Sequence, residues 1–136
     1  MKYRSSFLRP TVRKLLIAIS ILLWCGSAQA FTTEASYYTV ASCLAESEQC
    51  ITASGERLND EALTAASWDY AFGTRIRVTN LRNNREVILR INDRGPSRRL
   101  YHKGRTLDLS KKAFETLAPL SEGVINVKVE VIQCSQ

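Results

Sequence analysis

The stretch Arg85-Glu86-Val87-Ile88-Leu89-Arg90-Ile91-Asn92-Asp93-Arg94-Gly95-Pro96 joins a β-strand pattern to a carboxylate and a Gly-Pro turn. Val87, Leu89 and Ile91 occupy every second position, which is the period of a strand with one buried face. Asp93 follows where this strand ends, and the Gly-Pro pair after it predicts a rigid turn. The stretch therefore predicts a β fold that holds an aspartate at the end of a strand.

Strand patterns of the same kind lie on both sides of this stretch. Residues 74–79 and 124–132 alternate apolar with polar side chains, and a shorter strand is expected over residues 35–40. Asn83-Asn84 precedes the strand described above and predicts a hairpin, because asparagine tolerates left-handed backbone angles. Several strands in about 100 residues predict a small β-barrel or sandwich, and periodicity alone does not distinguish the two.

The first thirty residues predict a cleaved secretory signal. A basic leader precedes an apolar run from Leu15 to Trp24, and Ala28-Gln29-Ala30 has the small-x-small form of a cleavage site. The run is too short for a comfortable membrane span. We expect a signal over residues 1–30, one domain over residues 31–136, and export to the periplasm or cell envelope or into the medium, without stable membrane insertion after cleavage. An uncleaved anchor and lipid attachment at Cys25 are alternatives, although the bulky Trp24 disfavours lipidation.

A second aspartate lies ahead of the one predicted helix. In Thr106-Leu107-Asp108-Leu109-Ser110, the serine is a suitable N-cap for a helix over residues 111–117, which Pro119 would stop. Asp108 thus sits near a helix N-terminus, where the helix dipole favours negative charge. Two positioned carboxylates in an exported protein suggest chemistry on sugars. One acid/base can cut a glycosidic bond when a second group or the substrate supplies the nucleophile.

The charge and the cysteine content bear on the possible partners, disulfides and metal sites of the protein. Five of the 19 Lys and Arg residues lie in the leader, which leaves 14 against 13 Asp and Glu, so a nucleic-acid partner loses its support. After the leader, Cys43 and Cys50 could close a short disulfide loop, and Cys134 could instead pair with either. These cysteines and the single His102 lack the spacing of metal ligands. We expect no metal and no cofactor.

Seven short motifs occur in order along the chain and resemble the rare lipoprotein A (RlpA-like) family over about residues 34–132. The motifs are Ala35-Ser36-Tyr37-Tyr38, Thr52-Ala53-Ser54-Gly55-Glu56, Leu63-Thr64-Ala65-Ala66, Phe72-Gly73-Thr74, Val78-Thr79-Asn80, Asn92-Asp93-Arg94-Gly95-Pro96 and Leu107-Asp108-Leu109-Ser110. The resemblance implies a mainly β, six-stranded double-psi β-barrel with one or two short helices. It also implies a peptidoglycan lytic transglycosylase that cuts the MurNAc-GlcNAc bond of glycan strands and leaves 1,6-anhydro-muramyl ends.

The resemblance also assigns site residues. It implies Asp93 as general acid/base and Glu56 as a second functional carboxylate, while the family histidine is replaced here by Ser67. Asp108 resembles the helix-leading aspartate of related barrels such as expansins and is the third catalytic candidate.

Four further residues are candidates for binding the glycan. Thr64 and Ser67 could donate hydrogen bonds to it, and Arg94 would suit a muramyl carboxylate. Tyr37 could stack on a sugar ring, as could other aromatic residues, although aromatic residues at such spacings are more often core.

Three function classes stay open. The first is the lytic enzyme, acting as a monomer on peptidoglycan glycan strands. The second is a non-catalytic, expansin-like module that binds polysaccharide on the same barrel, which the loss of the family histidine at Ser67 favours. The third is a small secreted inhibitor or effector stabilised by disulfides, which the cysteines and the small size allow.

Overall fold

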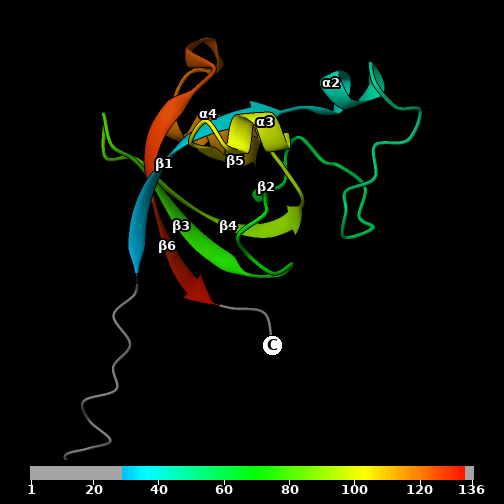
Figure 1. The fold of residues 1–136 in the computed structure, drawn as a ribbon. Helices are drawn as coiled ribbons and strands as arrows, with labels where there is room; N and C mark the ends of the chain where they lie inside the picture. The colour runs from blue at the N-terminus through cyan, green and yellow to red at the C-terminus, as the bar shows by residue number, and fades with distance from the viewer. Residues whose placement is uncertain (1–28, 134–136) are drawn as a thin grey trace, which may run out of the picture.

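Six strands close into a barrel in the order β1-β5-β2-β4-β3-β6 in the computed structural model (Figure 1). The structure describes residues 29–133, so residues 1–28 of the predicted signal, with Cys25, and also Cys134 lie outside the described residues. Strands β1 and β5 run parallel, as do β2 and β4, and the remaining neighbours are antiparallel. The strands are β1 (Ala30–Tyr38), β2 (Thr64–Ser67), β3 (Arg75–Asn80), β4 (Glu86–Asp93), β5 (Arg105–Ser110) and β6 (Ile125–Gln133). The predicted six-stranded β-barrel is confirmed.

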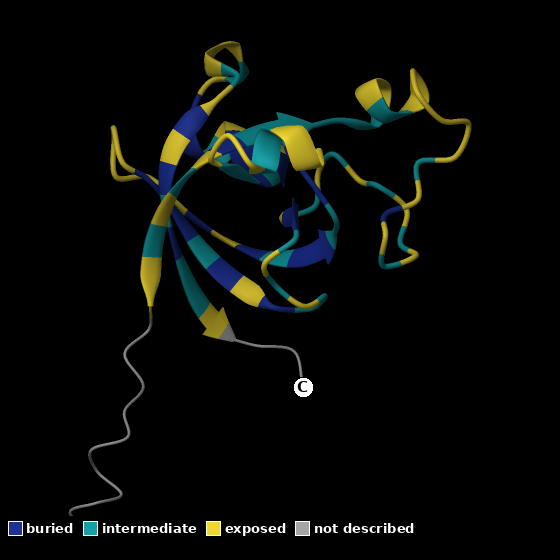
Figure 2. Ribbon diagram, viewed as in Figure 1, coloured by how far each residue is buried: buried dark blue, intermediate teal, exposed yellow. Residues whose placement is uncertain are grey.

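The barrel interior is filled by the apolar side chains that alternate along the strands, which appear as dark bands in Figure 2. The predicted inward faces of β3, β4 and β6 are buried. Phe114 of helix α4 (Lys111–Leu117) is fully buried among them, because α4 packs against β1, β4 and β5. The strand residues of the core are Ala35, Ala65, Ile76, Val78, Val87, Leu89, Ile91, Leu107, Leu109, Ile125, Val127 and Val129.

The helices are short and lie outside the barrel. Ser110 caps α4 as predicted, its hydroxyl accepting the Ala113 N–H, and the 3-10 helix η1 (Leu120–Glu122) follows Pro119. The described residues also contain α2 (Val40–Leu44) and α3 (Arg98–Tyr101), so there are three short α-helices where one or two were predicted. None of the helices in residues 29–133 is long and apolar enough to cross a membrane.

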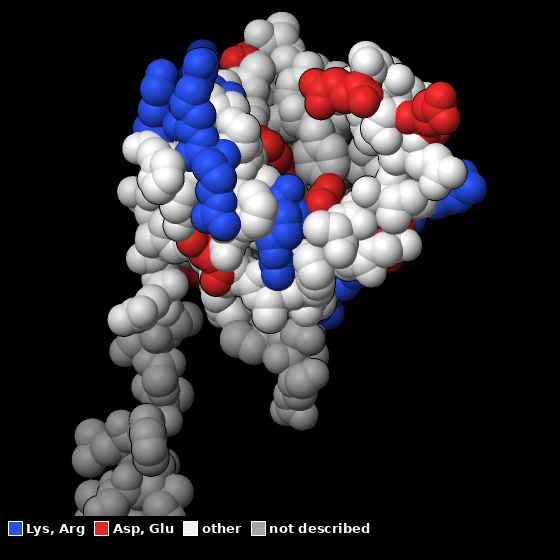
Figure 3. Space-filling model, turned by 45° about the vertical axis from the view of Figure 1, so that its right-hand side comes forward, with Lys and Arg blue, Asp and Glu red and all other residues white. Residues whose placement is uncertain are grey.

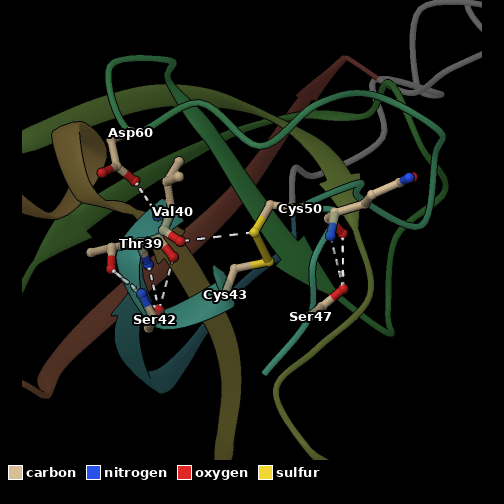
Figure 4. Close-up of a disulfide and its surroundings, with 8 residues drawn as sticks. Thr39, Val40, Ser42, Cys43, Ser47, Cys50 and Asp60 are labelled. Atoms are coloured by element: carbon tan, nitrogen blue, oxygen red, sulfur yellow. Dashed lines mark hydrogen bonds between the residues drawn. A yellow bond between two sulfur atoms is a disulfide. The ribbon is translucent and has the colours of Figure 1, made fainter. Parts of the chain in front are cut away.

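A disulfide joins Cys43 of α2 to Cys50 and closes a short loop (Figure 4). Thr39 caps α2 in a reciprocal arrangement with Ser42. The Asp60 carboxylate accepts the Val40 N–H at 2.8 Å and ties the start of α2 to the long segment that follows the disulfide. This segment, residues 50–63, runs from the disulfide back to β2 and passes the ends of the strands that carry the predicted site.

Candidate active site

Asp93 and Asp108 lie on either side of one residue, Ala66 of β2. In the register of the sheet, Ala66 pairs with Asp93 of β4 and with Asp108 of β5. The β2–β4 register shifts between Ala65 and Ala66, so that Ala66 lies opposite Asp93 and not Asn92. Residues paired across neighbouring strands point to the same face, and the adjacent Ala65 points into the core. Both aspartates therefore stand on the outer face of the barrel, two strand spacings or roughly 10 Å apart along the backbone.

Gly95 brings the chain after Asp93 back over this face. A Cβ atom at Gly95 would lie 3.3 Å from Ala66 Cβ and 3.6 Å from Asp108 Oδ2. The segment from Asp93 to Gly95 thus passes closely over Ala66 to the second carboxyl. A glycine is used here because the approach leaves little room for a side chain.

The Asp93 carboxylate is anchored through one oxygen. Its Oδ1 accepts the backbone N–H groups of Ala53 and Arg94, each at 2.8 Å. Among residues 29–133, Oδ2 has no hydrogen-bond partner, and the side chain is partly exposed. One oxygen is therefore fixed by the protein while the other is available to a ligand.

Asp108 has the opposite surroundings. The Ser36 hydroxyl of β1 donates to its Oδ1 in a very short contact. Burial raises the pKa of the Asp108 carboxyl above its ordinary value; the Ser36 hydrogen bond and the charge of Arg105 oppose this, and the charge of Asp93 adds to it. The protein therefore favours the neutral form of the Asp108 carboxyl.

Tyr38 completes the buried part of the site. It lies two residues after Ser36 on β1 and so faces the same side. Its hydroxyl is buried, and no atom of residues 29–133 meets hydrogen-bond geometry with it, although the Thr64 hydroxyl lies beside it. Burial, and then the charges of Asp93 and Asp108, raise the pKa of the Tyr38 hydroxyl far above its ordinary value.

Glu56 is held as an anion at the edge of the site. The Arg90 guanidinium donates to both of its oxygens, at 2.6 and 2.8 Å, and the Asn92 amide donates at 3.1 Å. These hydrogen bonds, that of Arg90 first, lower the pKa of Glu56 to about 2. Because Arg90 and Asn92 precede Asp93 on β4, Glu56 ties its own loop to that strand. The Ser54 N–H, which donates to the Asn92 carbonyl at 3.2 Å, adds a second tie.

Thr64 and Ser67 stand at the two ends of β2 and are both buried. Thr64 is on the same face as Ala66 and lies beside the Tyr38 hydroxyl. The Ser67 side chain is 1% exposed, and its hydroxyl accepts the Asp69 N–H at 3.2 Å. The structure thus places Thr64 on the face that carries the two aspartates, two residues from Ala66, and gives the Ser67 hydroxyl a backbone partner.

Arg94 and Tyr37 occupy supporting positions. The Arg94 guanidinium donates to the carbonyls of Ser67 and Tyr70, at 3.0 and 3.1 Å, and lies 3.8 Å above the Phe72 ring. It therefore fixes the turn after Asp93. The Tyr37 ring packs on Phe114, with ring centroids 4.9 Å apart, on the side of β1 opposite Tyr38.

The structure brings Asp93, Asp108 and Thr64 together, with Glu56 at the edge. Sequence reasoning did not assign functions to Ser36 and Ala53. The alternation of Ser36 with Tyr38 could have indicated a shared face, whereas Ala53 contributes only a backbone amide, for which a sequence carries no signal.

The surface around the site combines aromatic and charged groups. The Trp68 indole donates to the Pro96 carbonyl at 2.7 Å, and the Arg98 guanidinium lies 3.8 Å above the Trp68 ring. Figure 3 shows a hollow on one face of the molecule, with acidic side chains beside it and basic side chains near them. A separate cavity of about 670 Å³ lies between β1, the β3–β4 turn and the start of β6, and contains neither carboxylate. Two acids, Glu34 and Glu122, line that cavity, and Asp93 and Asp108 do not.

The sequence led us to expect no metal ion in this protein. Within residues 29–133, His, Cys, Asp and Glu form no group of three or more that could hold a metal ion.

Known proteins resemble this chain in sequence. A probable endolytic peptidoglycan transglycosylase RlpA of Nostoc sp. is 52% identical over 81 residues, which are 60% of this chain and 21% of the relative. The endolytic peptidoglycan transglycosylase RlpA of Pasteurella multocida is 46% identical over 82 residues, 60% of this chain and 26% of the relative. The chain spans about a quarter of the length of these curated relatives.

Two solved structures share the fold. A Streptomyces papain inhibitor superposes with a TM-score of 0.58 at 23% identity, covering 79% of this chain and 98% of its own. An expansin of Clavibacter michiganensis superposes with a TM-score of 0.56 at 18% identity, covering 79% of this chain and 52% of its own. These likenesses confirm the predicted double-psi β-barrel.

The sequence model of the family described as lytic transglycolase matches residues 25–129, which include all of β1 to β5 and most of β6. The chain therefore belongs to the lytic transglycolase family.

Proposed function

We propose that this protein is a peptidoglycan lytic transglycosylase that cleaves the MurNAc-GlcNAc bond and leaves 1,6-anhydro-muramyl ends. The observation that carries the proposal is the placement of Asp93 and Asp108 on one outer face, with the Oδ2 atom of Asp93 open to a ligand. The names of the relatives support the same activity, although this chain matches only part of each relative.

Asp93 is the general acid/base. Its protonated carboxyl gives a proton to the glycosidic oxygen, the C1–O bond breaks, and the GlcNAc side leaves as an alcohol. The carboxylate then takes the proton of the muramyl 6-hydroxyl, whose oxygen bonds to C1 and closes the anhydro ring. No water is consumed and the carboxyl ends protonated, so a single acid/base suffices.

The other residues support this step. Asp108, with its pKa raised by burial, presents a second carboxyl whose neutral form can donate to the glycan. Glu56 remains charged and positions the Ala53 loop through Arg90 and Asn92. Arg94 holds the turn that follows Asp93.

The proposal also includes export of the protein from the cytoplasm. Residues 1–30 act as a cleaved signal and residues 31–136 as the working domain, a monomer on glycan strands in the cell envelope. These assignments rest on the leader pattern and on the substrate class.

A non-catalytic polysaccharide-binding module is the second candidate. The observation that favours it is Ser67, which replaces the family histidine and is buried with its hydroxyl engaged by the Asp69 amide. Without an imidazole, this position has no group that exchanges a proton near neutral pH.

Mass spectrometry of soluble products separates the two candidates. Four proteins are each incubated with peptidoglycan that lacks stem peptides. They are the unmodified protein, Asp93→Asn, Asp108→Asn and the control Glu115→Gln, whose residue lies on the exposed side of α4. We expect anhydro-muramyl products from the unmodified protein and Glu115→Gln and none from Asp93→Asn. Activity that survives in Asp93→Asn but not in Asp108→Asn would move the acid/base to Asp108. Binding to the pelleted glycan without products would favour the module, and neither binding nor products would refute the proposal.

A further inference from the structure

The Tyr38 hydroxyl is buried at the site, and neither the described part of the fold nor the proposed acid/base step uses it. Buried polar groups nearly always have hydrogen-bond partners. Yet the Tyr38 hydroxyl meets hydrogen-bond geometry with no atom of residues 29–133. Since the atom is shielded from water, its partner must come from the groups that surround it.

The surrounding acceptors are the Thr64 hydroxyl and the two carboxyls, of which only the carboxyls carry charge. On β1, Ser36 and Tyr38 share a face, and Ser36 already donates to Asp108 on the neighbouring β5. Thr64 of β2 is beside the Tyr38 hydroxyl, and Asp93 and Asp108 flank β2 at Ala66, two residues further on. The charges of both aspartates act on the phenol. Tyr38 is therefore enclosed by the two carboxyls that the mechanism needs.

We infer that Tyr38 is a positioning residue of the carboxylate pair, whose hydroxyl donates a hydrogen bond to whichever of Asp93 and Asp108 carries the negative charge. The phenol can only serve as a donor to an anion. The inference deepens the proposed function, on which its kinetic test rests.

The Tyr38 phenol is neutral near neutral pH. Burial raises the pKa of Tyr38, and the charges of Asp93, Asp108 and, least, Glu56 add to this, so the hydroxyl keeps its proton. A donor that does not ionise stabilises the carboxylate after it has given up its proton. Removing the donor should therefore raise the pH at which the pair loses its proton.

The other charged groups near the carboxyl pair are Glu56, Arg94 and Arg105. Glu56 is neutralised by Arg90, and the Arg94 guanidinium is turned toward the carbonyls of Ser67 and Tyr70. Arg105 acts on Asp108 and favours its ionised form. None of these groups makes a hydrogen bond with the Tyr38 hydroxyl among residues 29–133.

The first test does not depend on activity. The titration of the aspartate carboxyl carbons is followed by NMR in the unmodified protein, Tyr38→Phe and Tyr37→Phe. Tyr37→Phe is the matched control, because this neighbouring ring packs on Phe114 on the other side of the strand. We expect the midpoint of the Asp93 and Asp108 titration to rise by about one pH unit in Tyr38→Phe, the size expected for a lost hydrogen bond to a charged group. We expect no change in Tyr37→Phe. Unchanged midpoints in Tyr38→Phe would overturn the inference.

The second test is the pH profile of glycan cleavage. The part of the rate-against-pH curve that follows the titration of the carboxyl pair should move to higher pH in Tyr38→Phe. It should stay in place in Tyr37→Phe. A uniform loss of rate in Tyr38→Phe without movement of this part of the curve would mean that the hydroxyl has only a structural role. If the unmodified protein cleaves no glycan, the proposed function fails while the NMR titration still decides the role of Tyr38.

Discussion

Asp93 and Asp108 flank Ala66 in the same sheet but meet opposite surroundings. Two backbone amides hold one oxygen of Asp93, and its other oxygen is open. Asp108 is desolvated and accepts the Ser36 hydroxyl, so the pKa of its carboxyl is raised by burial. Two carboxyls in unlike surroundings can take different roles in one acid/base step. The same difference affects stability.

Asp108→Asn should remove a pH-dependent cost of folding. The folded protein binds the Asp108 proton more tightly than the unfolded chain does, because burial raises its pKa above the ordinary 3.8. The free energy of unfolding of the unmodified protein should therefore fall, relative to the variant, as pH rises from about 3.8 through the folded-state value. Chemical denaturation at a series of pH values measures this difference. The exposed Glu61→Gln is the control, and a pH-independent difference for Asp108→Asn would contradict the prediction.

Gly95→Ala should lower activity because its methyl group has little room. The new Cβ would meet Ala66 Cβ at 3.3 Å and lie 3.6 Å from Asp108 Oδ2, so the segment that carries Asp93 must shift. A small displacement of an acid/base group can reduce the rate by about tenfold to a hundredfold. The rate of release of anhydro-muramyl products measures the loss.

A second substitution provides the control for Gly95→Ala. Ala66→Gly removes the methyl group that Gly95→Ala would strike, so the double variant should regain much of the lost activity. Ala66→Gly alone should cost only about 0.5–1 kcal/mol of stability, the usual effect of glycine in a strand. An additive loss in the double variant would show that crowding against Ala66 is not the cause.

Much of the fold could be predicted from the sequence. Strands β3, β4 and β6 lie within one residue of the predicted ranges, because each has one buried face and alternates. The strand β2 (Thr64–Ser67) was missed: all four residues are buried, so the segment shows no alternation. The parallel pairs that close the barrel join segments far apart in the chain, beyond the reach of any local pattern.

The site was predictable only in part, for the same reason. The sequence placed Asp93 at a strand end and Asp108 just ahead of a helix, but their common pairing with Ala66 depends on the unpredicted β2. Glu56 lies 34 residues before Arg90 in the chain, so their ion pair could not be foreseen. Its lowered pKa makes Glu56 unsuited to donate a proton near neutral pH.

The Cys43–Cys50 disulfide should stabilise the protein and hold the loop that serves Asp93. Replacing both cysteines by serine should lower the free energy of unfolding by about 2–3 kcal/mol, the value expected for a short closed loop. Activity should fall as well, because the Ala53 amide that bonds Asp93 follows the disulfide by three residues. Thermal unfolding with and without a thiol reductant measures the first effect. The reductant should lower the melting temperature of the unmodified protein and leave the double variant unchanged; equal effects on both would contradict the prediction.

Glu56→Gln tests whether this carboxylate works through position and charge. Glu56 and Arg90 are 43% and 42% exposed, so solvent screens their ion pair, and its loss should cost less than about 1 kcal/mol of stability. Because the pKa of Glu56 is lowered to about 2 from 4.5, its contribution is fully present above about pH 4.5 and disappears as pH falls toward 2. The difference in unfolding free energy between the unmodified protein and Glu56→Gln should shrink as pH falls over that range.

Glu86→Gln, which breaks a looser pair with Arg77 at 3.8 Å, is the matched control. Glycan cleavage should fall severalfold in Glu56→Gln and not in Glu86→Gln, since the Glu56–Arg90 pair, unlike the Glu86–Arg77 pair, helps to tie the Ala53 loop to β4. Complete loss of cleavage, with the fold intact, would instead indicate that Glu56 contacts the reacting atoms.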